Sequence, residues 1–268
     1  MSIRYYRPRR RSRRSITPLQ NAALISSLFA VIALHITYPL VSGEALRIIT
    51  IATVYVAALS MSLHALYSYG WKFAYRFVLT TFFYALIIEI IGTSTAWPFG
   101  QYSYSPTLGA QLWGVPLVVP CAWMMMAYPS LMMARRLTRH WVFLVGGYSL
   151  MAWDLFLDPQ MVSAGRWSWS FTGSHVPFQP EIPLSNAFGW MLTGMGLMAL
   201  LHLLLPRERR AQGPSRAVPE IFLLWTLIGG VIANLFYFDR PGIAFFAGIA
   251  MAIVVIPYFI AVQLGRND

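Results

Sequence analysis

The chain alternates between long apolar runs and short polar segments. A helix needs about 17–25 apolar residues to cross the hydrocarbon core of a bilayer, and runs of this length recur from end to end. They lie near residues 21–40, 47–67, 74–92, 113–134, 141–158, 186–205, 220–238 and 242–264. The pattern predicts an all-α, polytopic integral membrane protein with about eight transmembrane helices. We expect a basic tail over 1–20 and a single transmembrane helical domain over 21–268.

Composition and charge agree with this prediction. The chain is 57% hydrophobic and 11% charged, whereas soluble domains carry about 25% charged residues. Basic residues concentrate in the tail and in alternate loops, which the positive-inside rule assigns to the cytoplasm. Those beyond the tail are Lys72, Arg76, Arg135, Arg136, Arg139, Arg207, Arg209, Arg210, Arg216 and Arg266, against Arg47, Arg166 and Arg240 on the other side. We therefore expect a multi-pass cell-membrane protein with both termini cytoplasmic.

The net charge of +11 is thus explained by topology. The basic clusters are split between loops and contain no nucleic-acid-binding motif, so the bilayer, and not nucleic acid, is the expected partner. The first apolar run is also longer than the h-region of a signal peptide, and we interpret it as an uncleaved helix.

Two stretches of the chain repeat each other. In each copy an acid within an apolar run lies eleven residues before a glycine, the glycine opens a Gly-x-aromatic-Ser-aromatic string, and a proline lies seven residues before a tryptophan. The copies cover about 80–134, with Glu89, Gly100, Pro116 and Trp123, and about 141–206, with Asp154, Gly165, Pro183 and Trp190. This predicts a parallel repeat of helix pairs, the third with the fourth and the fifth with the sixth. The remaining helices are expected to form a surrounding shell.

Three acids are the candidate catalytic residues: Glu89, Asp154 and Asp158. An ionisable side chain at membrane depth is costly and is usually functional. Asp154 and Asp158 are four residues apart and share a helix face, so that repulsion and desolvation favour keeping a proton on one of them. The alternative is that these acids only hydrogen-bond neighbouring helices.

Aromatic and amide side chains near the acids are the candidate substrate-binding residues. They are Trp97, Tyr102, Tyr104, Trp123, Trp153, Trp167, Asn186 and Trp190. An aromatic face stabilises a cation, and a protonated acid beside such faces suits chemistry through a carbocation. The alternative for the tryptophans and tyrosines near helix ends is an interfacial anchoring belt.

No metal or cofactor is expected. The histidines are scattered without metal-binding spacing, and Cys121 is the single cysteine, which excludes a metal-binding or redox cysteine pair.

The strings EIIGTSTAWPFGQYSYSP, GVPLVVPCAW, AWDLFLDP, GRWSW and PLSNAFGW resemble those of the CruF-type carotenoid hydratases, polytopic membrane proteins of carotenoid biosynthesis. The resemblance covers roughly residues 80–192. It implies addition of water across the terminal 1,2 double bond of an acyclic carotenoid, giving a tertiary alcohol without metal or redox cofactor. An elongase or a glycosyltransferase of the same pathway is a candidate partner.

For this reaction we assign Asp154 as the proton donor, with Asp158 beside it, and Glu89 as the carboxylate that orients water; donor and base are interchangeable at this stage. Trp153, Trp190 and Tyr104 would face the cation, and Asn186 would hold the water. Three alternatives stay open: another acid-catalysed carotenoid enzyme such as a cyclase or an elongase, a proton-coupled transporter, and a non-catalytic scaffold.

Overall fold

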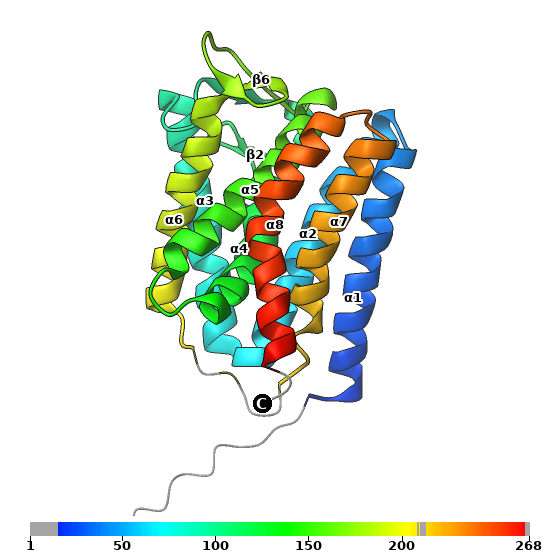
Figure 1. Ribbon diagram of the computed structural model, residues 1–268, viewed down its shortest axis with the longest axis vertical. Helices are drawn as coiled ribbons and strands as arrows, with labels where there is room; N and C mark the ends of the chain where they lie inside the picture. The colour runs from blue at the N-terminus through cyan, green and yellow to red at the C-terminus, as the bar shows by residue number, and fades with distance from the viewer. Residues whose placement is uncertain (1–15, 208, 210–212, 266–268) are drawn as a thin grey trace, which may run out of the picture.

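The computed structural model describes residues 16–207, 209 and 213–265. Most of the predicted basic tail, together with Arg210 and Arg266, lies outside the described residues. Eight α-helices follow one another along the described chain and form an upright bundle (Figure 1). They are α1 (Pro18–Thr37), α2 (Gly43–Tyr69), α3 (Trp71–Thr95), α4 (Val118–Leu137), α5 (Val142–Ser163), α6 (Leu184–Leu204), α7 (Ala217–Phe236) and α8 (Pro241–Leu264). The predicted all-α membrane fold is confirmed.

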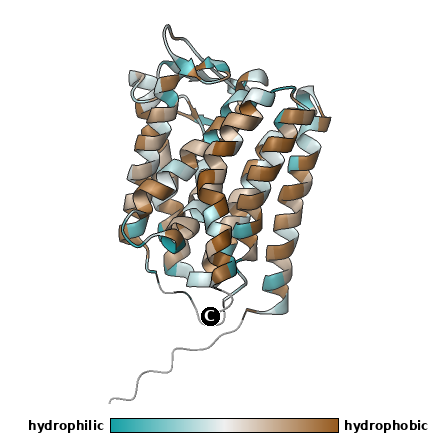
Figure 2. Cartoon of the chain, in the orientation of Figure 1, coloured by the Kyte–Doolittle hydropathy of each residue, from teal (hydrophilic) through white to brown (hydrophobic). Residues whose placement is uncertain are grey.

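Six of these helices, among the described residues, are long and apolar enough to cross a membrane: α1, α2, α3, α6, α7 and α8. Their outer faces expose large apolar side chains such as Phe29, Phe83, Phe188 and Phe245, a surface suited to lipid. Apolar residues dominate the helices, while polar residues gather at the two ends of the bundle (Figure 2). That α4 and α5 also span the bilayer stays a prediction.

Over a membrane-spanning length, α4 and α5 are less hydrophobic than the other six helices, because α4 ends with Arg135 and Arg136 and α5 contains two aspartates. Most side chains of α4 are buried, and α5 carries Asp154 and Asp158, both buried. α4 also begins later than the apolar run at 113–134 suggests. Residues Trp113 and Gly114 both have positive φ, at 49° and 82°, and they turn the chain into a short hairpin of β2 (Gln111–Leu112) with β3 (Val115–Pro116).

Three two-stranded sheets cover one end of the bundle (Figure 1). Besides the β2–β3 hairpin, β5 (His175–Val176) pairs with β6 (Gln179–Pro183), and β1 (Tyr102–Tyr104) pairs with β4 (Trp167–Trp169). Two short 3₁₀ helices, η1 (Tyr38–Leu40) and η2 (Pro106–Leu108), complete the described elements.

The β1–β4 pair joins the two Gly-x-aromatic-Ser-aromatic strings directly. Ser103 lies opposite Ser168, Tyr102 opposite Trp169, and Tyr104 opposite Trp167, in antiparallel register. This self-complementary register is the one expected of two strands related by a two-fold axis, as the predicted parallel repeat requires. The repeat itself stays a prediction, but the pairing brings the ends of α3 and α5 to the same face of the bundle.

α5 and α6 approach each other closely through glycines. A Cβ atom added at Gly147 would lie 2.6 Å from the backbone nitrogen of Met195, and one added at Gly194 would lie 3.1 Å from the Cα of Gly147. In a membrane, burying apolar surface between helices stabilises their association little, because lipid chains are equally apolar. Small residues instead allow the helix backbones to approach and pack closely. This contact sets α5, with its two aspartates, against α6.

Gly147→Ala is therefore expected to destabilise the bundle by about 1–3 kcal/mol, because the added methyl meets backbone that cannot rotate away. Gly229→Ala is the matched control, since its added Cβ would meet only a Trp225 ring atom at 3.5 Å. Thermal unfolding in detergent, followed by the monodisperse fraction after heating, measures the difference. Equal stability of the two variants would contradict the close approach of α5 and α6.

Candidate active site

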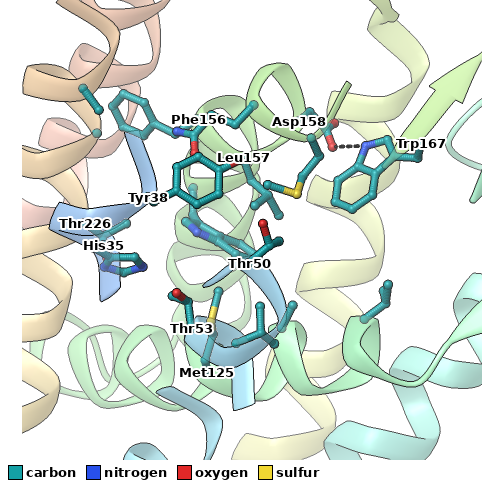
Figure 3. Close-up of a pocket in the computed structure, with 18 of the residues that line it drawn as sticks. His35, Tyr38, Thr50, Thr53, Met125, Phe156, Leu157, Asp158, Trp167 and Thr226 are labelled. Carbon is teal, nitrogen blue, oxygen red and sulfur yellow. Dashed lines mark hydrogen bonds between the residues drawn. The ribbon is translucent and has the colours of Figure 1, made fainter. Parts of the chain in front are cut away.

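A cavity of about 270 Å³ lies inside the bundle below the sheets. Glu89, Asp158 and Asn186 line it, with side chains from α2, α4 and α7 on the other walls. Figure 3 shows Asp158 and Trp167 at one side of this cavity and His35 and Thr226 at the other. The two carboxyl groups that line the cavity, Glu89 and Asp158, therefore lie away from its His35 and Thr226 side.

Glu89 lies on the inner face of α3, 3% exposed, and is held by three donors. The hydroxyls of Tyr102 and Tyr104 donate to its Oε2 at 2.6 and 2.7 Å, and Trp123 Nε1 donates to its Oε1 at 3.0 Å. Charge-assisted hydrogen bonds of this kind are the stronger ones in proteins. Three donors converging on one carboxyl suit a carboxylate that accepts hydrogen bonds.

The local sequence explains how the two tyrosines reach Glu89. Tyr102 and Tyr104 are two apart on strand β1 and therefore point to the same side of it. Tyr102 packs onto α3 where Gly92 leaves room, since a Cβ at that glycine would lie 2.6 Å from the tyrosine hydroxyl. Burial and the negative charge of Glu89 raise the pKa of both Tyr102 and Tyr104 above the ordinary value of 10. Both phenols thus keep their protons and act as donors.

The second polar group joins α5 to the first turn of α6. Asp154 and Asp158, one helical turn apart, both accept from Asn186 Nδ2, at 3.0 Å for Asp154 Oδ2 and 2.5 Å for Asp158 Oδ2. Trp167 Nε1 donates to Asp158 Oδ1 at 3.1 Å (Figure 3). Asp154 Oδ1 is buried and has no hydrogen-bond partner among the described residues. Two carboxyl groups sharing one amide favour a state with a proton held between them.

Tryptophans form the wall between the two polar groups. Trp123 and Trp190 stack with ring centroids 4.3 Å apart and an interplanar angle of 16°. Trp153 meets Trp190 edge-on, at 5.7 Å and 87°. All three line the cavity. Ring faces of this kind stabilise positive charge in a desolvated site.

The structure brings together most of the predicted site residues. Those that line the cavity are Glu89, Tyr102, Tyr104, Trp123, Trp153, Asp158, Trp167, Asn186 and Trp190. Asp154, predicted as the proton donor, does not line the cavity and contacts it through Asn186. Trp97 is 57% exposed and also lies outside the cavity, because α3 ends at Ala96 in the left-handed conformation and the chain turns outward.

Sequence reasoning missed the other half of the cavity. His35, Tyr38, Thr50, Thr53 and Trp225 line it, although α1, α2 and α7 were expected to form only a shell. Polar side chains inside these apolar runs were the available signal. For metal binding, the described residues contain no cluster of three or more histidine, cysteine, aspartate or glutamate side chains.

Comparisons with known proteins identify the family of the chain. No solved structure matches the chain. A bisanhydrobacterioruberin hydratase of Haloarcula japonica is 29% identical over 164 residues, which are 58% of this chain and 54% of the relative. The chain thus spans about half the length of that curated relative. A model of the family described as "Carotenoid biosynthesis protein" matches residues 47–257. Because the match covers well over half of the chain and includes both polar groups of the cavity, the protein belongs to this carotenoid biosynthesis family.

Proposed function

We propose that this protein is a hydratase that adds water across the terminal 1,2 double bond of an acyclic carotenoid to give a tertiary alcohol. One observation carries the proposal: two buried carboxyl groups with different partners, Glu89 and Asp158, line one apolar cavity walled by stacked tryptophans. The hydratase named among the relatives supports the reaction class. A hydrocarbon substrate also explains why such a site is built inside a membrane bundle.

The reaction needs a proton donor, a cation-stabilising wall and a base for water. We assign the donor to Asp158, because it lines the cavity, whereas Asp154 lies behind it. The proton of the Asp158 carboxyl adds to C2 of the alkene, and the π electrons form the C2–H bond, leaving a tertiary cation at C1. Trp123, Trp153 and Trp190 face that charge.

Water completes the addition. Its oxygen bonds to C1, and the proton that it loses passes to Glu89, whose carboxylate is oriented by the two tyrosines and Trp123. Return of that proton to Asp158 restores the resting enzyme, so that one water is consumed for each alcohol formed. Asp154, which shares Asn186 with Asp158, acts as a positioning residue.

The direct test is co-expression in a bacterium that makes lycopene, followed by mass spectrometry of the pigments. Hydration adds the mass of one water for each reacted end, and growth in heavy-oxygen water places the label in the hydroxyl. A pigment of unchanged mass but altered chromatography would indicate cyclisation, and unchanged pigment over several acyclic carotenoids would reject the enzyme. Deuterium oxide medium adds a second criterion, because protonation at C2 leaves one stable C–D bond.

Tyr104→Phe is expected to lower the hydration rate about tenfold, because loss of a hydrogen bond to a charged group costs about 1.5–3 kcal/mol. The variant keeps the ring packing and removes the donor to Glu89 Oε2. Since the pKa of Tyr104 is raised, the loss should be the same from neutral to mildly alkaline pH. Tyr148→Phe, on α5 outside the cavity, is the control and should retain the wild-type rate. A wild-type rate in Tyr104→Phe would remove this tyrosine from the mechanism.

We also propose that the sheets face the extracytoplasmic side and that both termini are cytoplasmic. The charge rule supports this orientation, since most basic residues lie away from the sheets. In a Cys121→Ser background, Ser103→Cys should react with an impermeant maleimide on intact cells, and Ser215→Cys only after lysis. Both serines are exposed, at opposite ends of the bundle. The reverse labelling pattern would invert the topology.

A further inference from the structure

The cavity does not end at the acids but continues to the outer surface of the bundle. Its far half is walled by α1 with η1, α2 and α7. Ile36 of α1 and Ile232 of α7 line it, yet they are 51% and 44% exposed. The cavity therefore opens sideways between α1 and α7. Both helices are long and apolar enough to span a membrane, and the exposed residues at this opening, Ile36 and Ile232, are apolar, as suits contact with lipid chains.

The wall of this far half offers few free hydrogen-bond donors, although several of its residues are polar. The hydroxyls of Thr50, Thr53 and Thr226 each donate to a carbonyl of their own helix, at 2.7, 2.7 and 2.8 Å. Trp225 Nε1 donates to His35 Nδ1 at 3.1 Å, which links α7 to α1. With these donors already satisfied, the space suits an apolar occupant.

α7 is shaped to leave this space open. Two glycines follow each other on it, and they differ in their surroundings. A Cβ at Gly230 would press on the ring of Phe156 at 3.1 Å, so that this glycine serves helix packing. A Cβ at Gly229 would meet only Trp225 of the same helix, at 3.5 Å, and Gly229 lines the cavity. A larger side chain at Gly229 would therefore fill the channel without displacing a neighbouring helix.

The cavity is also too small for a whole long polyene. Sites that enclose a drug-sized ligand measure about 300–1,000 Å³, and this one measures about 270 Å³. A longer hydrocarbon held at the acids by one end must extend beyond the cavity, and the opening between α1 and α7 is continuous with it.

We propose that this channel is the binding site for the polyene chain. Resting on the proposed function, the inference is that the terminal alkene lies at Asp158 and Glu89, the adjoining chain runs past Thr50 and Gly229, and the remainder passes between α1 and α7 into the bilayer. The substrate thus enters and leaves sideways from the lipid, and the bulk of residue 229 controls whether a long chain is accepted.

The test compares Gly229→Phe with Ile228→Phe in cells that make lycopene. Ile228 is the neighbouring residue, 44% exposed and outside the cavity, so that both variants add one ring to α7. Hydration by Gly229→Phe should fall about tenfold or more, because an aromatic ring placed in occupied space is strongly disfavoured. Ile228→Phe should keep the wild-type rate. Equal rates in the two variants would overturn the channel.

Photo-crosslinking keeps the test decisive if Gly229→Phe does not fold. A diazirine-bearing residue replaces Ala233, which lines the channel, or Ile228, which does not. Illumination should attach lycopene at position 233 and not above background at position 228, and the reverse or equal yields would refute the proposal. The two hypotheses also fail separately. An adduct at 233 without hydration by the wild type would retain the channel and reject the hydratase, whereas hydration without the adduct would do the opposite.

Discussion

Glu89→Gln is expected to lower the hydration rate by about 10²–10⁴-fold, the usual contribution of a positioned acid or base. The amide cannot take up the proton of water. Tyr102, Tyr104 and Trp123 all donate hydrogen bonds to the Glu89 carboxyl. In the variant, the glutamine NH₂ group replaces one accepting oxygen and would face these donors without being able to accept from them. We therefore expect an additional loss of stability of about 1–3 kcal/mol.

The control for Glu89→Gln is Glu181→Gln, which makes the same change at an exposed position of β6. Pigment mass spectrometry measures the rate, and thermal unfolding in detergent shows whether each variant is folded at the assay temperature. Glu89→Asp adds a further comparison, because it keeps the charge but withdraws it from the cavity. If folded Glu89→Gln still hydrates lycopene at the wild-type rate, Glu89 is a structural hydrogen-bond acceptor and the base lies elsewhere.

Asp158→Asn is expected to lower the hydration rate about 10²–10⁴-fold, as much as Glu89→Gln does. Asp154→Asn should lower the rate much less. Asp158 lines the cavity, and it accepts from Trp167 and Asn186. Among the described residues, Asp154 accepts a side-chain hydrogen bond from Asn186 alone, and it stands outside the cavity. Asp154→Asn leaves Asp158 and its hydrogen bonds from Trp167 and Asn186 in place, so that the remaining loss should come only from a disturbed position of Asn186.

This pair of isosteric changes, four residues apart on one helix face, serves as its own control. Activity of lycopene-producing cells, with protein amounts matched, gives both rates. An active Asp158→Asn beside an inactive Asp154→Asn would restore the assignment of Asp154 as donor. Equal losses in the two variants would indicate that the two aspartates act only in packing α5 against α6.

Hydropathy alone determined the helices. Each apolar run corresponds to a helix within a few residues. An apolar segment in lipid must satisfy its backbone hydrogen bonds within itself, so its own sequence is enough to predict a helix. The exception is the start of α4, where the left-handed turn at Trp113 and Gly114 forms a hairpin instead. The sequence likewise singled out Glu89, Asp158 and most of the aromatic residues that line the cavity. Acids inside apolar runs are costly wherever they lie, so they stand out without a structure.

Tertiary packing decided which of these groups meet. The rotation of α5, set by its glycine contact with α6, turns Asp158 toward the cavity and leaves Asp154 behind it. The repeat placed Trp123 and Trp190 in corresponding positions, but it predicted neither the stacking of these two rings nor the convergence of two tyrosines on Glu89. The channel between α1 and α7 was likewise absent from any motif. Cavities arise where helices fail to fill space, and that depends on how distant surfaces fit together.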